Sequence, residues 1–402
     1  MYDEKIIFVD DWNFNGELFI RDEIYYVGAN DRKISLFEGQ YQVHSMAYNS
    51  YVIMDEKIAV FDTVDKAVTE QWLQNLETVL NGRQPDYLII QHMEPDHSAS
   101  IMTFLHTYPG AQVIASKQAF TMMKQFYGSE YACNRRIVGE GDTLDLGKHQ
   151  LTFVTAPMVH WPEVIVTYDA TAKVLFSADG FGKFGAIDSE EYWECEARRY
   201  YFGIVGKYGA QVQALLKKAA ALDIQMILPL HGPILTRDID YYVGKYDIWS
   251  SYRPEDNGVC IVYTSVYGHT REGVEYLEQQ LEAQGCEVQC HNLASCDIAE
   301  AVEDAFRYSH LVLATTTYNG DVFPSMKTFI NKLTERNFQN RTVAMIENGS
   351  WAPTAAKVMT KMLEPCKDIT YMPQTVRIVS ALNDASRAQL EALLTELKKI
   401  KP

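Results

Sequence analysis

The second half of the chain alternates short apolar runs with amphipathic segments, and this alternation strongly restricts the possible fold. The apolar runs are VCIVYT, CEVQC, HLVLATTT, TVAMIE and TVRIVSA, and a segment with helical periodicity follows each of them. The helical segments are expected at 270–284, 298–308, 325–336, 354–363 and in a last stretch that ends at 398. Strands that alternate with helices in this way predict a doubly wound, five-stranded parallel sheet.

The first half follows a different pattern. Hairpin-like strands at 24–27, 48–54 and 58–62 precede the first long helix, expected near 66–80. The later apolar strands YLIIQ, QVIAS, LTFVTAP, KVLFSAD and QMILPL each run into a short polar loop. This pattern predicts a mixed α+β layered fold with a site along one edge.

The segment WSSYRPEDNG mixes proline, glycine, asparagine and charged residues between these two regions. Such a composition is typical of an interdomain linker. We therefore predict two domains, residues 1–253 and residues 254–402. A length of 402 residues and 47% hydrophobic content allow each domain a core of its own and exclude a disordered chain.

Charge and cysteine content limit the location and the partners. The first residues are acidic and polar, and no later run reaches about eighteen apolar residues, so neither a signal peptide nor a membrane span is expected. Seven cysteines without a C-x-x-C pair indicate a reducing cytoplasm, with no disulfide framework and no built-in rubredoxin or ferredoxin. A net charge of -17 argues against nucleic acid and anionic lipid as partners.

Four candidate metal ligands lie within six residues, directly after the strand YLIIQ. They are His92, Glu94, Asp96 and His97. A helix could place His92 and Asp96 on one face but would turn Glu94 away, whereas a loop stiffened by Pro95 can aim all four side chains inward. The loop therefore suits two metal ions.

Three more donors stand at the ends of later apolar strands. His160 follows LTFVTAPMV, Asp179 ends the run KVLFSAD, and His231 follows QMILPL. Strand ends place such groups along one rim of the fold. The sequence therefore offers three further candidate donors along one rim.

The motif H-x-E-x-D-H, followed by a distant His, an Asp and a His, resembles the metallo-β-lactamase-like domain of flavodiiron proteins, also called A-type flavoproteins. The flavodoxin-like pattern that follows extends the resemblance to the whole chain. The resemblance implies an αββα sandwich in which His92, Glu94 and His160 bind one iron and Asp96, His97 and His231 bind the other. It also implies that Asp179 bridges the two.

Glu94 distinguishes iron from zinc in this resemblance. Hydrolases of the same fold usually have a histidine at its position, and an added carboxylate makes the set harder and more anionic. Three carboxylates and four imidazoles suit iron better than a plain zinc pair. No catalytic residue is predicted beyond these ligands, although Tyr201 is a candidate donor to a metal-bound species and, equally, a candidate core residue.

Three loops of the second half resemble the FMN-binding loops of flavodoxins. The first follows the first strand and enters a helix, where backbone N–H groups can hold a phosphate. The others follow the third and fourth strands, at the edge where a doubly wound sheet binds its ligand. The predicted FMN-binding residues are Ser265, Tyr267, Gly268, His269, Thr270, Thr317, Tyr318, Asn319, Gly320, Asn348, Gly349, Ser350 and Trp351.

The resemblance implies an oxidoreductase that reduces dioxygen to water, nitric oxide to nitrous oxide, or both, with FMN supplying electrons to the iron pair. It also implies a head-to-tail homodimer, or a dimer of dimers, and an external electron donor such as rubredoxin or a flavin reductase. Two alternatives remain open: a dizinc hydrolase with an accessory flavodoxin domain, and a non-catalytic electron carrier.

Overall fold

The computed structural model describes residues 18–128 and 134–397. The N-terminal stretch without a predicted signal peptide and Cys133 lie outside the described residues. The chain divides into two compact units, Met1–Tyr201 with Ala210–Asp247, and Phe202–Gly209 with Ile248–Pro402. The domain boundary at residue 253 stays a prediction.

Two β-sheets form the centre of the first unit. The larger has the order β1-β2-β7-β8-β9-β10-β11 and the smaller the order β12-β13-β14-β15-β16. The larger sheet contains β1 (Phe19–Arg21), β2 (Ile24–Tyr26), β7 (Tyr51–Met54), β8 (Ile58–Phe61), β9 (Tyr87–Ile90), β10 (Gln112–Ala115) and β11 (Arg135–Ile137). The smaller contains β12 (Thr143–Asp145), β13 (Gln150–Thr155), β14 (Ile165–Asp169), β15 (Val174–Phe176) and β16 (Met226–Leu228).

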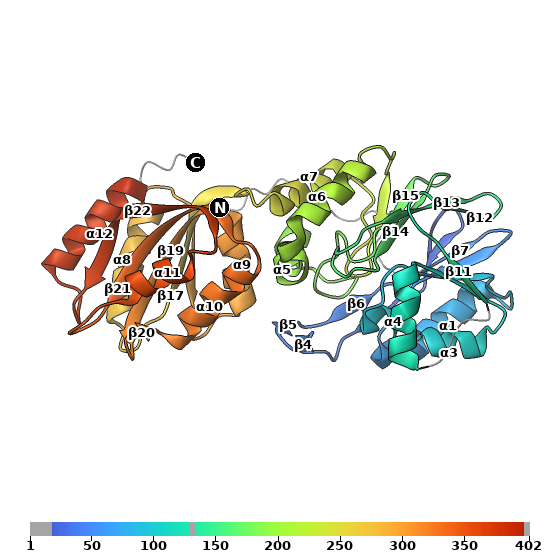
Figure 1. Cartoon of the computed structure of the whole chain (residues 1–402), viewed down its shortest axis with the longest axis horizontal. Coiled ribbons are helices and arrows are strands. Elements are labelled where there is room, and N and C mark those ends of the chain that lie inside the picture. The colour runs from blue at the N-terminus through green and yellow to red at the C-terminus, as the bar shows by residue number, and fades with distance from the viewer. Residues whose placement is uncertain (1–17, 129–133, 398–402) are drawn as a thin grey trace. The chain divides into compact units, whose positions relative to one another are not determined.

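Helices cover the outer faces of both sheets. The helices α1 (Thr69–Leu80), α3 (Ile101–Thr107) and α4 (Lys117–Tyr127) lie beside the larger sheet, and α6 (Gly209–Ala219) and α7 (Ile239–Ser250) beside the smaller one (Figure 1). Two short hairpins complete the unit, β3 (Ala29–Asp31) with β6 (Met46–Tyr48), and β4 (Leu36–Phe37) with β5 (Tyr41–Gln42). The predicted αββα sandwich is confirmed.

The core of the first unit lies between the facing sheets. Every second residue of a strand points inward, because side chains alternate along a strand. Phe61 of the larger sheet stacks on Phe176 of the smaller one, with ring centroids 3.9 Å apart and both side chains fully buried. Each such side chain contributes about 1.5–3 kcal/mol through burial. This contact packs the two sheets against each other.

The second unit is a parallel sheet of the order β18-β17-β19-β21-β22, with the short β20 paired antiparallel to β19. Its strands are β17 (Asp256–Tyr263), β18 (Val288–Asn292), β19 (Tyr308–Tyr318), β20 (Asp321–Val322), β21 (Gln339–Asn348) and β22 (Lys367–Ile378). Its helices are α8 (His269–Glu282), α9 (Ile298–Arg307), α10 (Pro324–Glu335), α11 (Ala355–Met362) and α12 (Asp384–Leu397). The predicted doubly wound sheet is confirmed, and its order is that of the flavodoxin-like type.

Two local predictions differ from the structure. The last strand, expected at 375–381, begins at Lys367, because it is an edge strand whose first half is largely exposed and carries no apolar run. The expected linker is also shorter, since α7 extends to Ser250 and β17 begins at Asp256. The buried guanidinium of Arg341 donates to the carbonyl oxygen of Tyr252 at 2.8 Å, which fastens this connection to the second unit.

The helices were also compared with the length and hydropathy of a membrane-spanning helix. Among the described residues, no helix is both long enough and apolar enough to cross a lipid bilayer. Helix α1, for example, buries one apolar face with Trp72, Leu76 and Leu80.

The ion pair of His291 and Asp304 predicts a pH-dependent stability of the second unit. Their Nε2 and Oδ2 atoms lie 2.8 Å apart. Burial lowers the pKa of His291, but hydrogen bonds with Asp304 and Cys296 outweigh it and raise the pKa to about 9. A raised pKa in the folded state stabilises the fold below the unfolded pKa of about 6.5, and this stabilisation is lost as the pH rises through the folded value.

His291→Gln should therefore cost roughly 2 kcal/mol at pH 6, progressively less as the pH rises from about 6.5 to 9, and almost nothing above pH 9. Thermal unfolding followed by circular dichroism across this range measures the gap between the variant and the wild type. His106→Gln, at an exposed position, is the matched control. A gap that stays constant with pH would contradict the assignment.

Candidate metal centre and flavin loops

Seven polar side chains meet at one edge of the sandwich, where strands of both sheets end. His92, Glu94, Asp96 and His97 follow β9 of the larger sheet. His160 lies between β13 and β14, Asp179 follows β15, and His231 follows β16 of the smaller sheet. The strand-end positions expected from the sequence are therefore those that the structure brings together.

The first ligand-bearing segment differs in part from the predicted loop. Residues 92–94 are extended, but Pro95–Ser98 form a single helical turn, α2. Proline favours this arrangement because its fixed φ suits the first position of a helix. The extended part aims His92 and Glu94 at one place, and the turn aims Asp96 and His97 at another.

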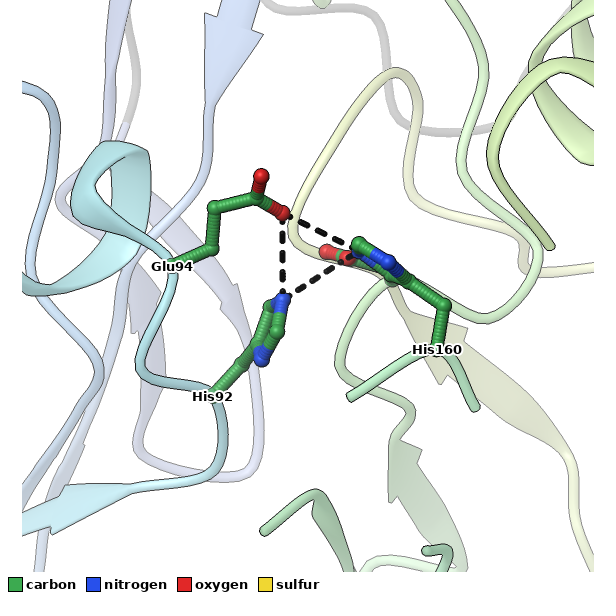
Figure 2. Close-up of side chains that lie close together, drawn as sticks. His92, Glu94 and His160 are labelled. Atoms are coloured by element: carbon green, nitrogen blue, oxygen red, sulfur yellow. Dashed lines mark hydrogen bonds and ion pairs between the residues drawn. The ribbon is translucent and has the colours of Figure 1, made fainter. Parts of the chain in front are cut away.

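The first group of donors comprises His92, Glu94, His160 and Asp179. The Nε2 atom of His160 lies 3.0 Å from Oε2 of Glu94 and 3.0 Å from Oδ2 of Asp179. The Nε2 atom of His92 lies 3.3 Å from each of the same two oxygens. Figure 2 shows His92, Glu94 and His160 pointing toward one another.

The second group comprises Asp96, His97 and His231. The Nε2 atoms of His97 and His231 lie 3.0 Å apart, and they lie 3.3 Å and 3.2 Å from Oδ2 of Asp96. Metal–ligand bonds of about 2.1 Å separate neighbouring ligand atoms by roughly 3.0–3.4 Å. Both groups therefore have the spacing of a metal coordination shell.

Asp179 joins the two groups. Its Oδ2 faces the first group, whereas its Oδ1 lies 3.2 Å from Nε2 of His97 and 3.8 Å from Nε2 of His231. One carboxylate thus presents one oxygen to each side. This is the geometry that a carboxylate bridging two metal ions requires.

Several buried polar atoms in these groups have no hydrogen-bond partner. They are both carboxylate oxygens of Asp96 and Oδ1 of Asp179. Such orphaned atoms are costly in a protein interior unless a metal or a proton satisfies them. A donor set of carboxylate oxygens and imidazole nitrogens matches the preference of iron. The residues present therefore fit the metal pair that the fold implies.

Close contacts between carboxylates and histidines shift the pKa values of both kinds of group in the cluster. Burial raises the pKa of Asp179, but the charge of His92 and hydrogen bonds with His160 outweigh it and hold the pKa well below its usual range. Burial lowers the pKa of His160, but hydrogen bonds with Asp179 and Glu94 raise it to about 9. The carboxylates therefore favour positive charge at the histidines, and a bound metal ion would supply that charge in place of protons.

A second layer of hydrogen bonds orients the histidines. The carboxylate of Glu163, itself buried, lies 2.8 Å from Nδ1 of His92 and accepts the backbone N–H of Met93 at 2.8 Å. Nδ1 of His231 lies 2.8 Å from the carbonyl oxygen of Ala47. Each contact leaves Nε2 as the atom that faces the cluster. Sequence analysis missed Glu163, although its position three residues after His160 was a usable signal.

Asp62 supports the same segment from the end of β8. Its Oδ1 accepts the backbone N–H of Gln91 at 2.8 Å and that of His92 at 3.2 Å. Asp62 adopts a positive φ of 52°. The backbone at the start of the ligand segment is thereby fixed by a neighbouring strand.

Tyr200 and Tyr48 lie beside the cluster, whereas the candidate Tyr201 is a core residue. The ring of Tyr200 lies 5.5 Å from that of His231, whereas Tyr201 is buried against Tyr246 with ring centroids 5.1 Å apart. Helix α5 (Trp193–Tyr200) gives way to a π-helical turn at Tyr201, which changes the direction of the following side chains. The sequence alone does not predict this π-helical turn.

In the second unit, hydrogen bonds link the predicted FMN loops to one another. The Thr270 hydroxyl lies 3.3 Å from that of Thr316 and accepts from the Asn348 amide at 3.3 Å. The Asn348 amide also donates to the carbonyl oxygen of Ser380, at 3.3 Å. A fourth loop, after β22, therefore joins the three that sequence analysis named.

Two of the predicted residues have a structural role in addition to their place in the loops. The Ser265 hydroxyl accepts the backbone N–H groups of Gly268 and Arg271, and the Thr317 hydroxyl accepts those of Thr354 and Ala355. These contacts fix the starts of α8 and α11. The rings of Tyr267 and Trp351, which are 89% and 93% exposed, stand open at this edge and are available to flank a flavin ring.

Comparison with known proteins agrees with both halves of the chain. Residues 46–232 match the family model described as "ODP family beta lactamase", and residues 260–384 match a flavodoxin domain. A nitric oxide reductase of Moorella thermoacetica is 28% identical over 360 residues, which cover 87% of this chain and 90% of the relative.

Two solved structures share the fold over almost the whole chain. Rubredoxin oxygen:oxidoreductase from Desulfovibrio gigas superposes with a TM-score of 0.86 at 25% identity, over 95% of this chain and 98% of that one. The flavodiiron protein from Giardia intestinalis superposes with a TM-score of 0.85 at 25% identity, over 95% and 96%. By domain content and fold, this chain belongs with the flavodiiron proteins. The resemblance stated from the sequence is confirmed.

Within this flavodiiron fold, Glu163 can be tested as the residue that orients His92. Glu163→Gln keeps the size of the side chain and removes its charge, so we expect metal affinity to fall by roughly 10–100-fold. Competition with a chelator, followed by metal analysis, measures this loss. Asp169→Asn is the matched control, because Asp169 also binds a buried histidine, His149, at 2.5 Å but lies outside the cluster. Equal losses in the two variants would contradict the prediction.

The flavin loop of this flavodiiron fold can be tested at Gly268, which precedes α8 with a φ of 96°. Gly268→Ala strains this conformation by about 1–2 kcal/mol, so we expect FMN to bind roughly tenfold more weakly. Fluorescence titration of flavin-free protein measures the dissociation constant. Gly285→Ala introduces similar strain beyond the other end of α8, where φ is 77°. It should leave FMN affinity unchanged, and an equal effect of both changes would contradict the assignment.

Proposed function

We propose that this protein is a flavodiiron oxidoreductase that reduces dioxygen to water, nitric oxide to nitrous oxide, or both. The observation that carries the proposal is Asp179, whose two oxygens face two separate groups of donors. Relatives of the same architecture are named as a nitric oxide reductase and a rubredoxin oxygen:oxidoreductase. An iron pair at this site would supply two electrons at once, and FMN would return them.

We assign His92, Glu94 and His160 to one iron, Asp96, His97 and His231 to the other, and Asp179 to both. The distances among the donor atoms and the orphaned oxygens of Asp96 support this assignment. The chain's own task at the site is to hold these seven groups in place, which Glu163 and the Ala47 carbonyl do through the far nitrogens of two histidines.

The buried surroundings control the polarity of the site. His92, His97, Asp179 and His231 are each at most 1% exposed. The rings of Phe37, Tyr48 and Tyr200 pack around His231. Such a shell keeps bulk water away from the donor set and strengthens the electrostatic interactions within it.

A dizinc hydrolase is the alternative from another enzyme class. The same cluster geometry could hold zinc, but Glu94 adds an anionic donor that zinc hydrolases of this fold usually lack. The relatives that share both domains with this chain are named as reductases. We therefore favour the oxidoreductase.

We further propose that residues 254–402 bind FMN through the predicted loops of the second unit, with the metal pair in residues 1–253. The linked hydroxyls and amide of Thr270, Thr316 and Asn348 support a shared binding edge. The proposal extends to a head-to-tail homodimer in the cytoplasm, with an external donor such as rubredoxin or a flavin reductase. Seven scattered cysteines without a C-x-x-C pair support a reducing compartment.

The decisive experiment measures metal, flavin and gas consumption on the same preparation. The purified protein is analysed for iron, zinc and FMN, reduced without air, and given pulses of dioxygen or nitric oxide under an electrode. We expect iron and FMN with rapid consumption of at least one gas. Zinc without gas consumption, together with thioester or lactam hydrolysis, would favour the hydrolase.

Asp179→Asn tests the bridge. Replacing one carboxylate oxygen by an amide removes a negative charge and one metal-facing donor, so we expect iron content to fall and gas reduction to drop by roughly 100-fold or more. FMN content should stay unchanged. Asp304→Asn, a buried carboxylate of the second unit, is the control. Unchanged turnover in Asp179→Asn would contradict the bridging role.

A further inference from the structure

An apolar cavity lies between the smaller sheet and the helices α6 and α7, which run beside that sheet in Figure 1. Side chains alternate between the two faces of each strand, and those on the outer face of the smaller sheet form one wall of the cavity. Phe153, Ile165 and Phe176 point into the core of the sandwich. Their neighbours Val154, Val166 and Leu175 therefore point the other way, and they line the cavity together with Ile227.

The helices form the opposite wall. Val212 and Leu216 of α6 and Val243 of α7 face the strands across the cavity. Its volume is about 30 Å³. A single water molecule needs roughly 10–15 Å³ on the same measure, so the cavity is large enough for a diatomic molecule and far too small for an organic cofactor.

The polar groups in the wall are already satisfied. The lining contains two hydroxyl side chains, those of Ser177 and Tyr246. The Ser177 hydroxyl donates to the carbonyl oxygen of Gly180 at 2.6 Å, and the Tyr246 oxygen accepts the backbone N–H of Phe181 at 2.6 Å. A buried water needs two to four polar partners, and these groups are already engaged, so the cavity favours an apolar occupant.

Some residues that line the cavity are direct sequence neighbours of residues in the metal cluster. Val159 immediately precedes His160, and Gly180 and Phe181 immediately follow Asp179. Both of these cluster residues belong to the first donor group. The cavity wall therefore includes the immediate chain neighbours of two proposed ligands of the same iron.

We propose that this cavity is a binding site for one molecule of a small apolar gas, which it holds beside the metal centre. The identity of the natural gas as dioxygen or nitric oxide rests on the proposed function, whereas the binding of an apolar atom or diatomic does not. Because such gases partition into apolar surroundings, the cavity raises their local concentration at the first donor group.

Xenon is the probe for this site, because it binds dry apolar cavities without hydrogen bonds. Crystals of the metal- and flavin-loaded protein are pressurised with xenon, and the position and occupancy of bound xenon are measured. We expect xenon between α6 and the smaller sheet in the wild type. Absence of xenon there would overturn the proposal.

Three variants sharpen the test. Val212→Phe fills the cavity and should abolish xenon binding, whereas Leu216→Ala enlarges it and should increase the occupancy. Ala214→Phe places the same ring on the exposed side of α6 and should leave xenon in place. Overpacking by Val212→Phe costs about 1–3 kcal/mol, so Leu216→Ala keeps the test decisive if the filled variant folds poorly.

Kinetics then separate this proposal from the proposed function. In Val212→Phe, the KM for the gas should rise several-fold with kcat at saturating gas and iron content unchanged. An unchanged KM despite lost xenon binding would overturn the role of the cavity. Xenon binding in a protein that consumes no gas would instead reject the reductase and leave the gas-binding cavity established.

Discussion

The carboxylate of Asp179 is the constraint on which the metal site depends. It is almost fully buried, and its two oxygens face different sets of histidines at 3.0–3.8 Å. A buried carboxylate in such surroundings is stable only with positive charge on both sides. The strands on either side must therefore bring histidines from two sheets to one point, and the stacked core of Phe61 and Phe176 holds those sheets together.

The two units place their functional groups in the same way, although the groups themselves differ. In each, functional groups lie in loops at the ends of buried strands, where rigid sheets fix positions and loops are free to vary. In the first unit the loops carry acids and imidazoles that suit a metal pair. In the second, hydroxyls, an amide and exposed aromatic rings suit a phosphate and a flat ring. The pairing of these two chemistries in one chain is what favours electron transfer over hydrolysis.

Much of this could be predicted from the sequence because the informative residues are close together or follow apolar strands. His92 to His97 form a single motif, and the strand ends point to His160, Asp179 and His231. Tyr200 and the cavity could not be found in this way, since each depends on packing between distant segments. Glu163 was missed although it lies only three residues after His160. Tyr201 shows the limit most clearly: the sequence left it as either a donor to the metal site or a core residue, and in the structure it packs on Tyr246 while the ring of Tyr200 lies beside His231.

The central claim is that Asp179 couples two metal ions in one chain, and Mössbauer spectroscopy of protein loaded with ⁵⁷Fe tests it most directly. The account predicts two iron ions per chain whose oxidised state is a spin-coupled pair, as a shared carboxylate and neighbouring ligand sets require. A single iron per chain, or two irons with the spectra of isolated ions, would contradict it.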